Sequence, residues 1–444
     1  MNARDTALKV LQEMETGNRK SEEVLNRLLE RSDASRNDRA LARELVSGTL
    51  KYRLQCDFVI RKFYLHDYTK AAPVLKNILR LGVYQLLHLD RVPRPAAVDE
   101  CVKLARKYKG DHLSRLVNGV LRKISPKSVD FDAWTRDLSD AERLSILHSY
   151  PDWLVSRWIE RYGAERTEAM LVHGNRPPAT GYRINRLKTV AGDIPAGNLP
   201  GDTRKLGDGL DNFFFSQEFS VMEPLLKGGL VSVQNPAQGL ACLLAAPQPG
   251  SVVFDMCAAP GGKSTYMAEL MGNQGRIIAL DRTAAKLRRI EENAHALGIT
   301  IIEAREGDAL AFDPECQPDT ILLDAPCTGT GVLGRRAELR WRTGPDKLDE
   351  LIRLQSAMLD RAAELLAPSG TLVYATCSVE PEENERQIEA FLARHPEFKI
   401  DGIPAGFPKA YLPAETGDGW MLTLPGERDG FDGAFAVRLS KQGT

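Results

Sequence analysis

Two cysteines stand directly behind short apolar runs in the second half of the chain. Cys327 comes soon after residues 320–323, and Cys377 comes soon after residues 371–374. A cysteine thiolate can bind its substrate covalently, which divides one difficult step into two easier ones. A lone cysteine is usually a small buried hydrophobe. If the two runs are neighbouring strands of one parallel sheet, however, both thiols emerge at the same edge and form a candidate nucleophilic centre.

A glycine-rich turn follows another apolar run, residues 252–254, and contains Cys257, Ala258, Ala259, Pro260, Gly261, Gly262 and Lys263. Such a turn between a strand and a helix lets the backbone approach a ligand and points helix N–H groups at its acceptors. A P-loop would need a glycine where Cys257 stands, and the motif G-x-G-x-x-G is broken at residues 258–260. The turn therefore fits neither of these phosphate-binding motifs.

One aspartate follows each of four apolar runs: Asp255, Asp281, Asp308 and Asp324. A single such residue is more often a helix cap or a strand end, but four at one edge of a sheet favour a binding site. Asp281 lies 19 residues beyond Gly262, near the spacing at which a carboxylate binds ribose hydroxyls. An adenosine with a compact zwitterionic tail in place of phosphates would fit, and S-adenosylmethionine answers that description.

A cysteine beside S-adenosylmethionine suits the methylation of C5 in a pyrimidine. That carbon is a poor nucleophile until a thiolate adds to C6 and pushes electron density onto C5. The adduct must then lose the C5 proton and expel the thiolate, which calls for a base or a second assisting group. The carboxyl group of Asp324 could hydrogen-bond to the base-pairing edge of the ring and stabilise it. These arguments leave open which cysteine attacks.

The elements that must position these residues change type along the chain. From about residue 231, β-rich runs such as 277–280 and 301–302 alternate with helical segments such as 284–297 and 348–366. This βαβ pattern predicts a parallel, doubly wound sheet of the Rossmann-like type, with ligands at the carboxyl ends of its strands. The first 125 residues instead show apolar positions at helical spacing, for example in residues 75–87, and predict an all-α domain.

We divide the 444 residues into three parts, which is a number of domains that this length supports. Residues 1–128 form the all-α domain. Residues 129–230 form a helical linker and a small α/β subdomain, with strand-like stretches such as residues 181–184. Residues 231–444 form the α/β catalytic domain, whose closing antiparallel hairpin includes residues 429–431 and 435–439.

Charge is distributed unevenly between these parts. The whole chain carries a net charge of −1, but residues 1–127 hold 26 lysines and arginines against 15 aspartates and glutamates, a balance of +11. The remainder therefore carries −12. A basic lobe on a nearly neutral protein is typical of a protein with a polyanionic partner, although a solvated helical surface is the plainer interpretation.

Composition and targeting signals narrow the class of protein. No apolar run approaches the roughly 20 residues of a membrane span, and the charged amphipathic N-terminus lacks the core of a signal peptide. We therefore expect a cytoplasmic protein without a membrane partner, whose seven cysteines are reduced thiols. Since the cysteines form no CxxC pair, we expect no metal site. We also expect a monomer.

The N-terminal part resembles the RNA-binding fold of the transcription antitermination protein NusB. The resemblance runs through residues 42–48, residues 79–86 and residues 117–122, and it covers most of residues 1–125. It implies a helical RNA-binding module, in agreement with the charge balance.

The C-terminal part resembles the RNA cytosine-C5 methyltransferases. The resemblance rests on the turn at residues 257–263, on Asp324-Ala325-Pro326-Cys327-Thr328-Gly329, and on Ala375-Thr376-Cys377-Ser378 followed by Glu380-Pro381-Glu382-Glu383-Asn384. Together with the NusB-like part, the whole chain looks like the Sun/Fmu group of these enzymes, which methylates one cytosine of 16S ribosomal RNA. The resemblance implies S-adenosylmethionine as cofactor and 16S ribosomal RNA as partner.

The same resemblance implies a role for each candidate residue. Cys377 would be the nucleophile, and Cys327 would help to release the enzyme from the methylated base. Residues 257–263 would wrap the cofactor, with Lys263 near its carboxylate. Three aspartates would complete the site. Asp281 would hold the ribose, Asp308 would reach the adenine, and Asp324 would lie between the methyl donor and the cytosine. Asp255 has no specific family role.

Two departures from the family pattern concern residues around the site. The family often has Val-Gln-Asp where this chain has Val233-Gln234-Asn235, and arginine where this chain has Lys286. Both affect substrate positioning or local charge pairing, and neither removes a catalytic group.

Two alternatives to 16S methylation stay open on the sequence. One keeps the chemistry and changes the RNA to tRNA or 23S rRNA. The other is a non-catalytic RNA-binding protein with a decayed methyltransferase fold. Decay should have removed a cysteine, the Gly-Gly-Lys turn or Asp324, and all of these are present.

Overall fold

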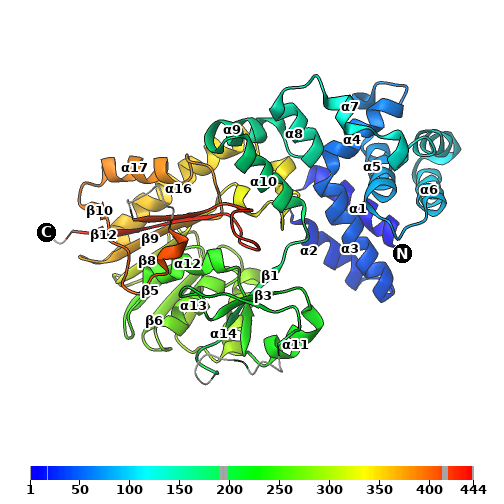
Figure 1. Ribbon diagram of the computed structural model, residues 1–444. Helices are drawn as coiled ribbons and strands as arrows, with labels where there is room; N and C mark the ends of the chain where they lie inside the picture. Colours follow the sequence, from blue (N-terminus) through cyan, green and yellow to red (C-terminus); the bar gives the residue numbers. More distant parts are fainter. Residues whose placement is uncertain (1, 18, 190–193, 195–198, 413–418, 443–444) are drawn as a thin grey trace. The chain divides into compact units, whose positions relative to one another are not determined.

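The computed structural model describes residues 2–17, 19–189, 194, 199–412 and 419–442, and it divides into two compact units (Figure 1). Unit 1 contains Met1–Asn175 together with Leu333–Arg342, and unit 2 contains Arg176–Val332 together with Thr343–Thr444. The three-part division made from the sequence stays a prediction. Within the described ranges, no helix is both long enough and apolar enough to cross a bilayer.

Unit 1 is helical, as the periodicity of its sequence predicts. Its first six helices are α1 (Ala3–Thr16), α2 (Ser21–Glu30), α3 (Arg36–Lys51), α4 (Arg53–Phe63), α5 (Pro73–His88) and α6 (Arg94–Leu121). The Asn2 side chain caps α1 by accepting a hydrogen bond from the Asp5 backbone N–H, 2.9 Å away. The apolar faces of the six helices meet in one core. Shorter helices follow: α7 (Phe131–Thr135), α8 (Asp140–His148), α9 (Asp152–Tyr162) and α10 (Ala164–Asn175).

A short segment far along the chain completes unit 1. Residues 333–342 end in helix α15 (Leu339–Arg342), and Arg340 in this helix is 1% exposed. Its guanidinium donates hydrogen bonds to five oxygens of unit 1, on Lys51, Ser149, Tyr150, Gly174 and Asn175. The segment is therefore an integral part of the helical unit.

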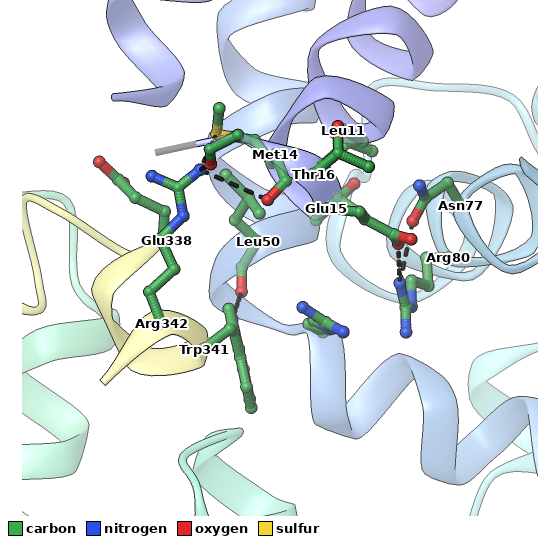
Figure 2. A pocket seen from close by; sticks show the side chains of 13 residues that line it. Leu11, Met14, Glu15, Thr16, Leu50, Asn77, Arg80, Glu338, Trp341 and Arg342 are labelled. Carbon is green, nitrogen blue, oxygen red and sulfur yellow. Dashed lines mark hydrogen bonds and ion pairs between the residues drawn. The ribbon is translucent and has the colours of Figure 1, made fainter. Parts of the chain in front are cut away.

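The same segment lines a cavity of about 360 Å³ in unit 1. Figure 2 shows Trp341 beside Leu50, whose carbonyl accepts a hydrogen bond from the indole N–H at 2.6 Å, and Arg342 at the end of α1. Arg342 donates to the backbone carbonyls of Met14 and Gly17 at 3.4 and 2.6 Å. Because the last carbonyls of a helix receive no hydrogen bond from an N–H group within it, Arg342 supplies donors for them and serves as a side-chain cap of α1.

A small antiparallel sheet opens unit 2. Its strands lie in the order β2 (Arg204–Lys205), β3 (Phe213–Ser216), β1 (Thr180–Ile184) and β4 (Val231–Val233). Helix α11 (Phe219–Lys227) packs with it around a core that includes Tyr182, Phe214 and Met222. This confirms the small α/β subdomain and the strand expected at residues 181–184.

The main sheet of unit 2 has the strand order β10-β12-β9-β8-β5-β6-β7, with β11 paired to β12. The parallel strands are β5 (Val252–Asp255), β6 (Arg276–Asp281), β7 (Ile302–Glu306), β8 (Thr320–Asp324) and β9 (Thr371–Thr376). Antiparallel strands continue the sheet beyond β9. They are β10 (Phe398–Ile400), β11 (Trp420–Thr423) and β12 (Ala434–Lys441). The expected runs are therefore strands, and the Rossmann-like sheet is confirmed. In the closing hairpin, residues 435–439 lie in β12 as expected, whereas residues 429–431 lie in the connection between β11 and β12.

Helices cover both faces of this sheet (Figure 1). One face packs against α12 (Pro236–Ala245), α13 (Gly262–Leu270) and α14 (Ala284–Leu297). The other packs against α16 (Pro345–Leu365) and α17 (Glu385–Arg394). With both faces buried, the edge at the carboxyl ends of the parallel strands is the place for a ligand.

Candidate active site

The two cysteines meet at the carboxyl ends of neighbouring strands. Strands β8 and β9 are paired in parallel, with Asp324 opposite Ala375, and the sulfur atoms of Cys327 and Cys377 lie 3.2 Å apart. Both thiols are partly exposed. Two backbone hydrogen bonds fix the loops that carry them, from Ala325 N to Ala375 O at 2.8 Å and from Gly331 N to Cys377 O at 3.0 Å. The strand order thus brings together two residues that are 50 positions apart.

The two thiols differ in their surroundings. The pKa of the Cys327 thiol is raised well above its ordinary value, first by its hydrogen bond with Cys377, then by burial, and further by the nearby carboxylates of Glu383 and Asp324. A pair of thiols at this distance shares protons, so the first deprotonation leaves one thiolate and one thiol that donates to it.

Asp324, which ends β8, forms an ion pair with Lys263. The Nζ atom of Lys263 lies 2.7 Å from the Asp324 carboxylate, and it also donates to the side-chain carbonyl of Gln238. Burial lowers the pKa of the Lys263 ammonium, but the Asp324 carboxylate raises it, and the net shift is upward. Lys263 is therefore a cation at neutral pH, next to the thiol pair.

The glycine-rich turn leads from β5 into α13. Gly261 has φ = 99°, a left-handed conformation that glycine adopts without strain, and it stands as the N-cap of the helix. Ala258 N–H donates to Leu280 O at 2.8 Å, and the Pro260 carbonyl accepts from the Asn293 side chain at 2.8 Å. Ala259, Gly262 and Cys257 lie in the same turn, and burial raises the pKa of the Cys257 thiol.

A buried ion pair supports the start of α13, and sequence reasoning missed it. Arg183 of β1 and Glu269 of α13 are joined at 2.7 Å, and both side chains are at most 1% exposed. Arg183 also donates to the Gly262 carbonyl at 3.1 Å and to the Gln234 side chain. In the sequence Arg183 looks like any surface arginine. Its buried position depends on how β1 pairs with its neighbouring strands, which the sequence around it does not reveal.

The remaining aspartates lie at the same edge of the sheet. Asp281 ends β6, and one of its carboxylate oxygens accepts from the Lys286 side chain at 2.9 Å and from the Arg282 backbone N–H at 2.7 Å. Asp308 follows β7 and pairs with Arg282 at 2.5 Å, which lowers the pKa of its carboxyl group. Asp255 ends β5, is fully buried, and accepts from the Ser264 hydroxyl at 2.6 Å.

These residues fit an adenosine cofactor at this edge. The second oxygen of Asp281 accepts no hydrogen bond from the described residues, so it is available to a ribose hydroxyl. The first N–H groups of α13 lack acceptors within the helix and suit a carboxylate. Lys286 stands where the family pattern often has arginine, and in this chain it forms an ion pair with Asp281 at 2.9 Å.

The second departure, Asn235, has a structural role. Its side chain caps α12 by accepting from Ala237 N–H, and it donates to the Gly430 carbonyl at 2.8 Å. An aspartate at this position could accept the capping hydrogen bond from Ala237 N–H, but its carboxylate could not donate one to the Gly430 carbonyl. Asparagine can do both.

Comparisons with known proteins cover the whole chain. Residues 241–440 match the family 16S rRNA methyltransferase RsmB/F, residues 1–126 match the NusB family, and residues 150–194 match the ferredoxin-like domain of RsmF/B-like methyltransferases. The crystal structure of PH0851 is 27% identical with a TM-score of 0.80, and the similarity covers 99% of this chain and 98% of that one.

Two bacterial relatives are similar over their full length. The probable ribosomal RNA small subunit methyltransferase B of Synechocystis sp. is 34% identical, with 99% of this chain and 100% of the relative covered. Its counterpart in Bacillus subtilis is also 34% identical, with 100% and 99% covered. With a NusB domain, a ferredoxin-like subdomain and a Rossmann-like catalytic domain, the chain belongs to the ribosomal RNA small subunit methyltransferase B family.

Proposed function

We propose that this chain methylates C5 of one cytosine in 16S ribosomal RNA, with S-adenosylmethionine as the methyl donor and a covalent bond between Cys377 and C6 of the base. The observation that carries the proposal is the thiol pair, 3.2 Å between sulfur atoms, beside the Asp324–Lys263 ion pair. C5 methylation needs one thiol to attack and a second group to assist release, and the pair supplies both.

The residues of the chain would act in a fixed order. The Cys377 thiolate adds to C6, and the electron pair of the C5–C6 bond moves toward C5. Asp324 hydrogen-bonds to the base-pairing edge and stabilises the activated ring. After methylation the C5 proton leaves to a base, the C6–sulfur bond breaks, and the thiolate of Cys377 is restored. Cys327 would assist this last step by donating a hydrogen bond to the departing sulfur atom of Cys377.

The cofactor would be held by the edge of the sheet around β5, β6 and β7. When bound, S-adenosylmethionine supplies an electrophilic methyl group on sulfur. Residues 257–263 would surround it, with the N-terminus of α13 and Lys263 toward its carboxylate, Asp281 at the ribose and Asp308 toward the adenine. The unused oxygen of Asp281 supports this assignment.

The substrate is expected to be RNA with an accessible base. A cytosine inside a duplex must be unstacked at a cost of a few kcal/mol before C5 and C6 can be reached, so a loop or junction is favoured. The NusB match and the balance of +11 in residues 1–127 support an RNA partner for the N-terminal part. We propose a cytoplasmic enzyme, since ribosomal RNA is its substrate.

The test is a gel assay with the Cys327→Ala variant, S-adenosylmethionine and a 16S rRNA transcript. If Cys377 attacks and Cys327 assists release, the variant accumulates a covalent protein–RNA complex that migrates slowly on a denaturing gel. The complex should require the cofactor and should disappear when Cys377 is also changed to alanine.

Two other results would contradict the assignment. Methyl transfer by a Cys377→Ala enzyme, without an adduct in Cys327→Ala, would make Cys327 the nucleophile. An adduct with tRNA or 23S rRNA in place of 16S rRNA would keep the chemistry and change the substrate.

A further inference from the structure

Two adjacent residues, Glu383 and Asn384, each hold one of the two cysteine loops. The Glu383 carboxylate accepts hydrogen bonds from the backbone N–H of Thr328 at 2.9 Å and from the Thr328 hydroxyl. It also accepts from Gln355 at 2.9 Å, and the Gln355 amide donates in turn to the Pro326 carbonyl at 2.9 Å. Both chain neighbours of Cys327 are therefore tied to Glu383, one directly and one through Gln355.

Asn384 holds the other loop in the same way. Its side-chain carbonyl accepts from the Thr376 hydroxyl at 2.7 Å, and its amide donates to the Ser378 backbone carbonyl at 3.0 Å. Thr376 and Ser378 are the chain neighbours of Cys377. A Tyr374 hydroxyl bonded to the Glu383 carbonyl at 2.6 Å fixes the backbone between the two loops. One dipeptide thus holds the backbone on both sides of each cysteine.

The two loops differ in charge. Glu383 is 0% exposed, and its carboxylate has no cationic partner among the described residues, because its donors are an amide, a hydroxyl and a backbone N–H. Its negative charge lies under the Cys327 loop. The ammonium group of Lys263 interacts electrostatically with Cys377 and pairs with Asp324. The other titratable groups that act on Cys327 are Cys377 itself, Asp324 and the buried Tyr374.

We infer that Glu383 and Asn384 are positioning residues of the thiol pair, and that the buried charge of Glu383 beside the Cys327 loop, together with the Lys263 ammonium that acts on Cys377, leaves the thiolate on Cys377. A negative charge disfavours a second negative charge nearby, and a cation favours one. The arrangement therefore supplies an electrostatic reason for an asymmetry that the two thiols lack by themselves. The inference rests on the proposed roles of the cysteines but concerns a property of the free protein.

The experiment measures the alkylation of each thiol by iodoacetamide as a function of pH, with peptide mass spectrometry to separate Cys327 from Cys377. In the wild type, Cys377 should react at lower pH than Cys327. In Glu383→Gln, which keeps the shape of the side chain and removes its charge, the Cys327 midpoint should fall by about one pH unit. Its reaction rate at pH 8 should then rise about tenfold. Glu383→Asp should return the midpoint toward the wild-type value.

The matched control is Glu382→Gln, because Glu382 pairs with Arg386 on the surface at 3.0 Å. The inference is overturned if Cys327 keeps its midpoint in Glu383→Gln, or if Glu382→Gln moves it equally. If thermal melting finds Glu383→Gln unfolded, Lys263→Met tests the other charge: the Cys377 midpoint should rise, and an unchanged midpoint overturns the inference. Since no RNA takes part, these results are independent of the adduct assay.

Discussion

Asp255 is the residue whose titration should be visible in the stability of the protein. Its side chain is fully buried at the end of β5, with a single side-chain donor, Ser264. Burial raises the pKa of its carboxyl group to about 7, and the Ser264 hydrogen bond offsets part of this rise. The ordinary value of 3.8 applies to the unfolded chain. The folded state therefore holds this proton more tightly than the unfolded state.

The sign of the pH dependence follows from linkage. A raised pKa in the folded state contributes stability that is complete below about pH 4 and is lost as the pH rises toward 7. Between pH 5 and pH 8 we expect the free energy of unfolding to fall further in the wild type than in Asp255→Asn, whose side chain cannot titrate. The difference between the two decreases should be on the order of 2 kcal/mol. Urea unfolding at the two pH values, without cofactor, measures this, and parallel losses in both proteins would contradict it.

At the level of single residues, sequence reasoning located the groups that terminate strands. Cys327, Cys377 and Asp324 could be placed at one edge because the strand pattern fixes which residues emerge there. It did not locate Glu383, which lies 55 positions from its partner Thr328. The role of a carboxylate depends on which loop it reaches, and the run of acidic residues at 380–383 looks solvent-exposed in the sequence, whereas Glu380 and Glu383 are buried.

Among the elements, the segment 333–342 is one for which the sequence supports no prediction. It contains the run Gly334-Arg335-Arg336 and the later residues Arg340, Trp341 and Arg342. In the structure Arg340 lies over the Tyr150 ring, with 3.7 Å from its guanidinium carbon to the ring centroid. Its hydrogen-bond partners Lys51 and Ser149 are 289 and 191 positions away. Local periodicity carries no signal for contacts at such separations, so the sequence could not predict this element.

Replacement of Arg340 should destabilise unit 1. Arg340→Met fills the volume but leaves five oxygens without their donor, and each unsatisfied buried acceptor costs about 1–3 kcal/mol. Since these acceptors can partly relax, we expect a total loss on the order of 3 kcal/mol. Arg340→Lys should recover little, because an ammonium group cannot reach five acceptors in the planar fork of a guanidinium.

Differential scanning calorimetry of the full chain measures this loss, with Arg335→Met of the same segment as a comparison. A melting temperature of Arg340→Met within one degree of the wild type would contradict the structural role of the arginine. An equal loss in Arg335→Met would mean that the segment as a whole, and not the five hydrogen bonds of Arg340, provides the stability.

At the scale of the whole molecule, charge and chemistry are assigned to different parts of the chain. Residues 1–127 carry +11, and the rest, which contains both cysteines and all four aspartates of the site, carries −12. A basic part attracts the phosphate backbone of RNA, and a part with a net negative charge does so less. This division agrees with the proposed function, in which the N-terminal part contributes to RNA binding and the catalytic part holds the target base.

The similarity to small subunit methyltransferases predicts selectivity among RNAs. With equal concentrations of 16S rRNA, 23S rRNA and tRNA transcripts, we expect methyl transfer from labelled S-adenosylmethionine to the 16S transcript only, at a single cytosine that bisulfite sequencing can locate. The expectation follows from the full-length similarity to small subunit methyltransferases, in which the NusB match accompanies the catalytic match.

The Cys377→Ala protein is the control for methylation by contaminants. Faster transfer to tRNA or 23S rRNA would contradict the proposed substrate. It would leave the proposed chemistry intact, because the thiol pair acts in the same way on a cytosine of any RNA. Transfer to assembled 30S particles but not to the naked transcript would keep the substrate and add the ribosomal proteins to what the enzyme recognises.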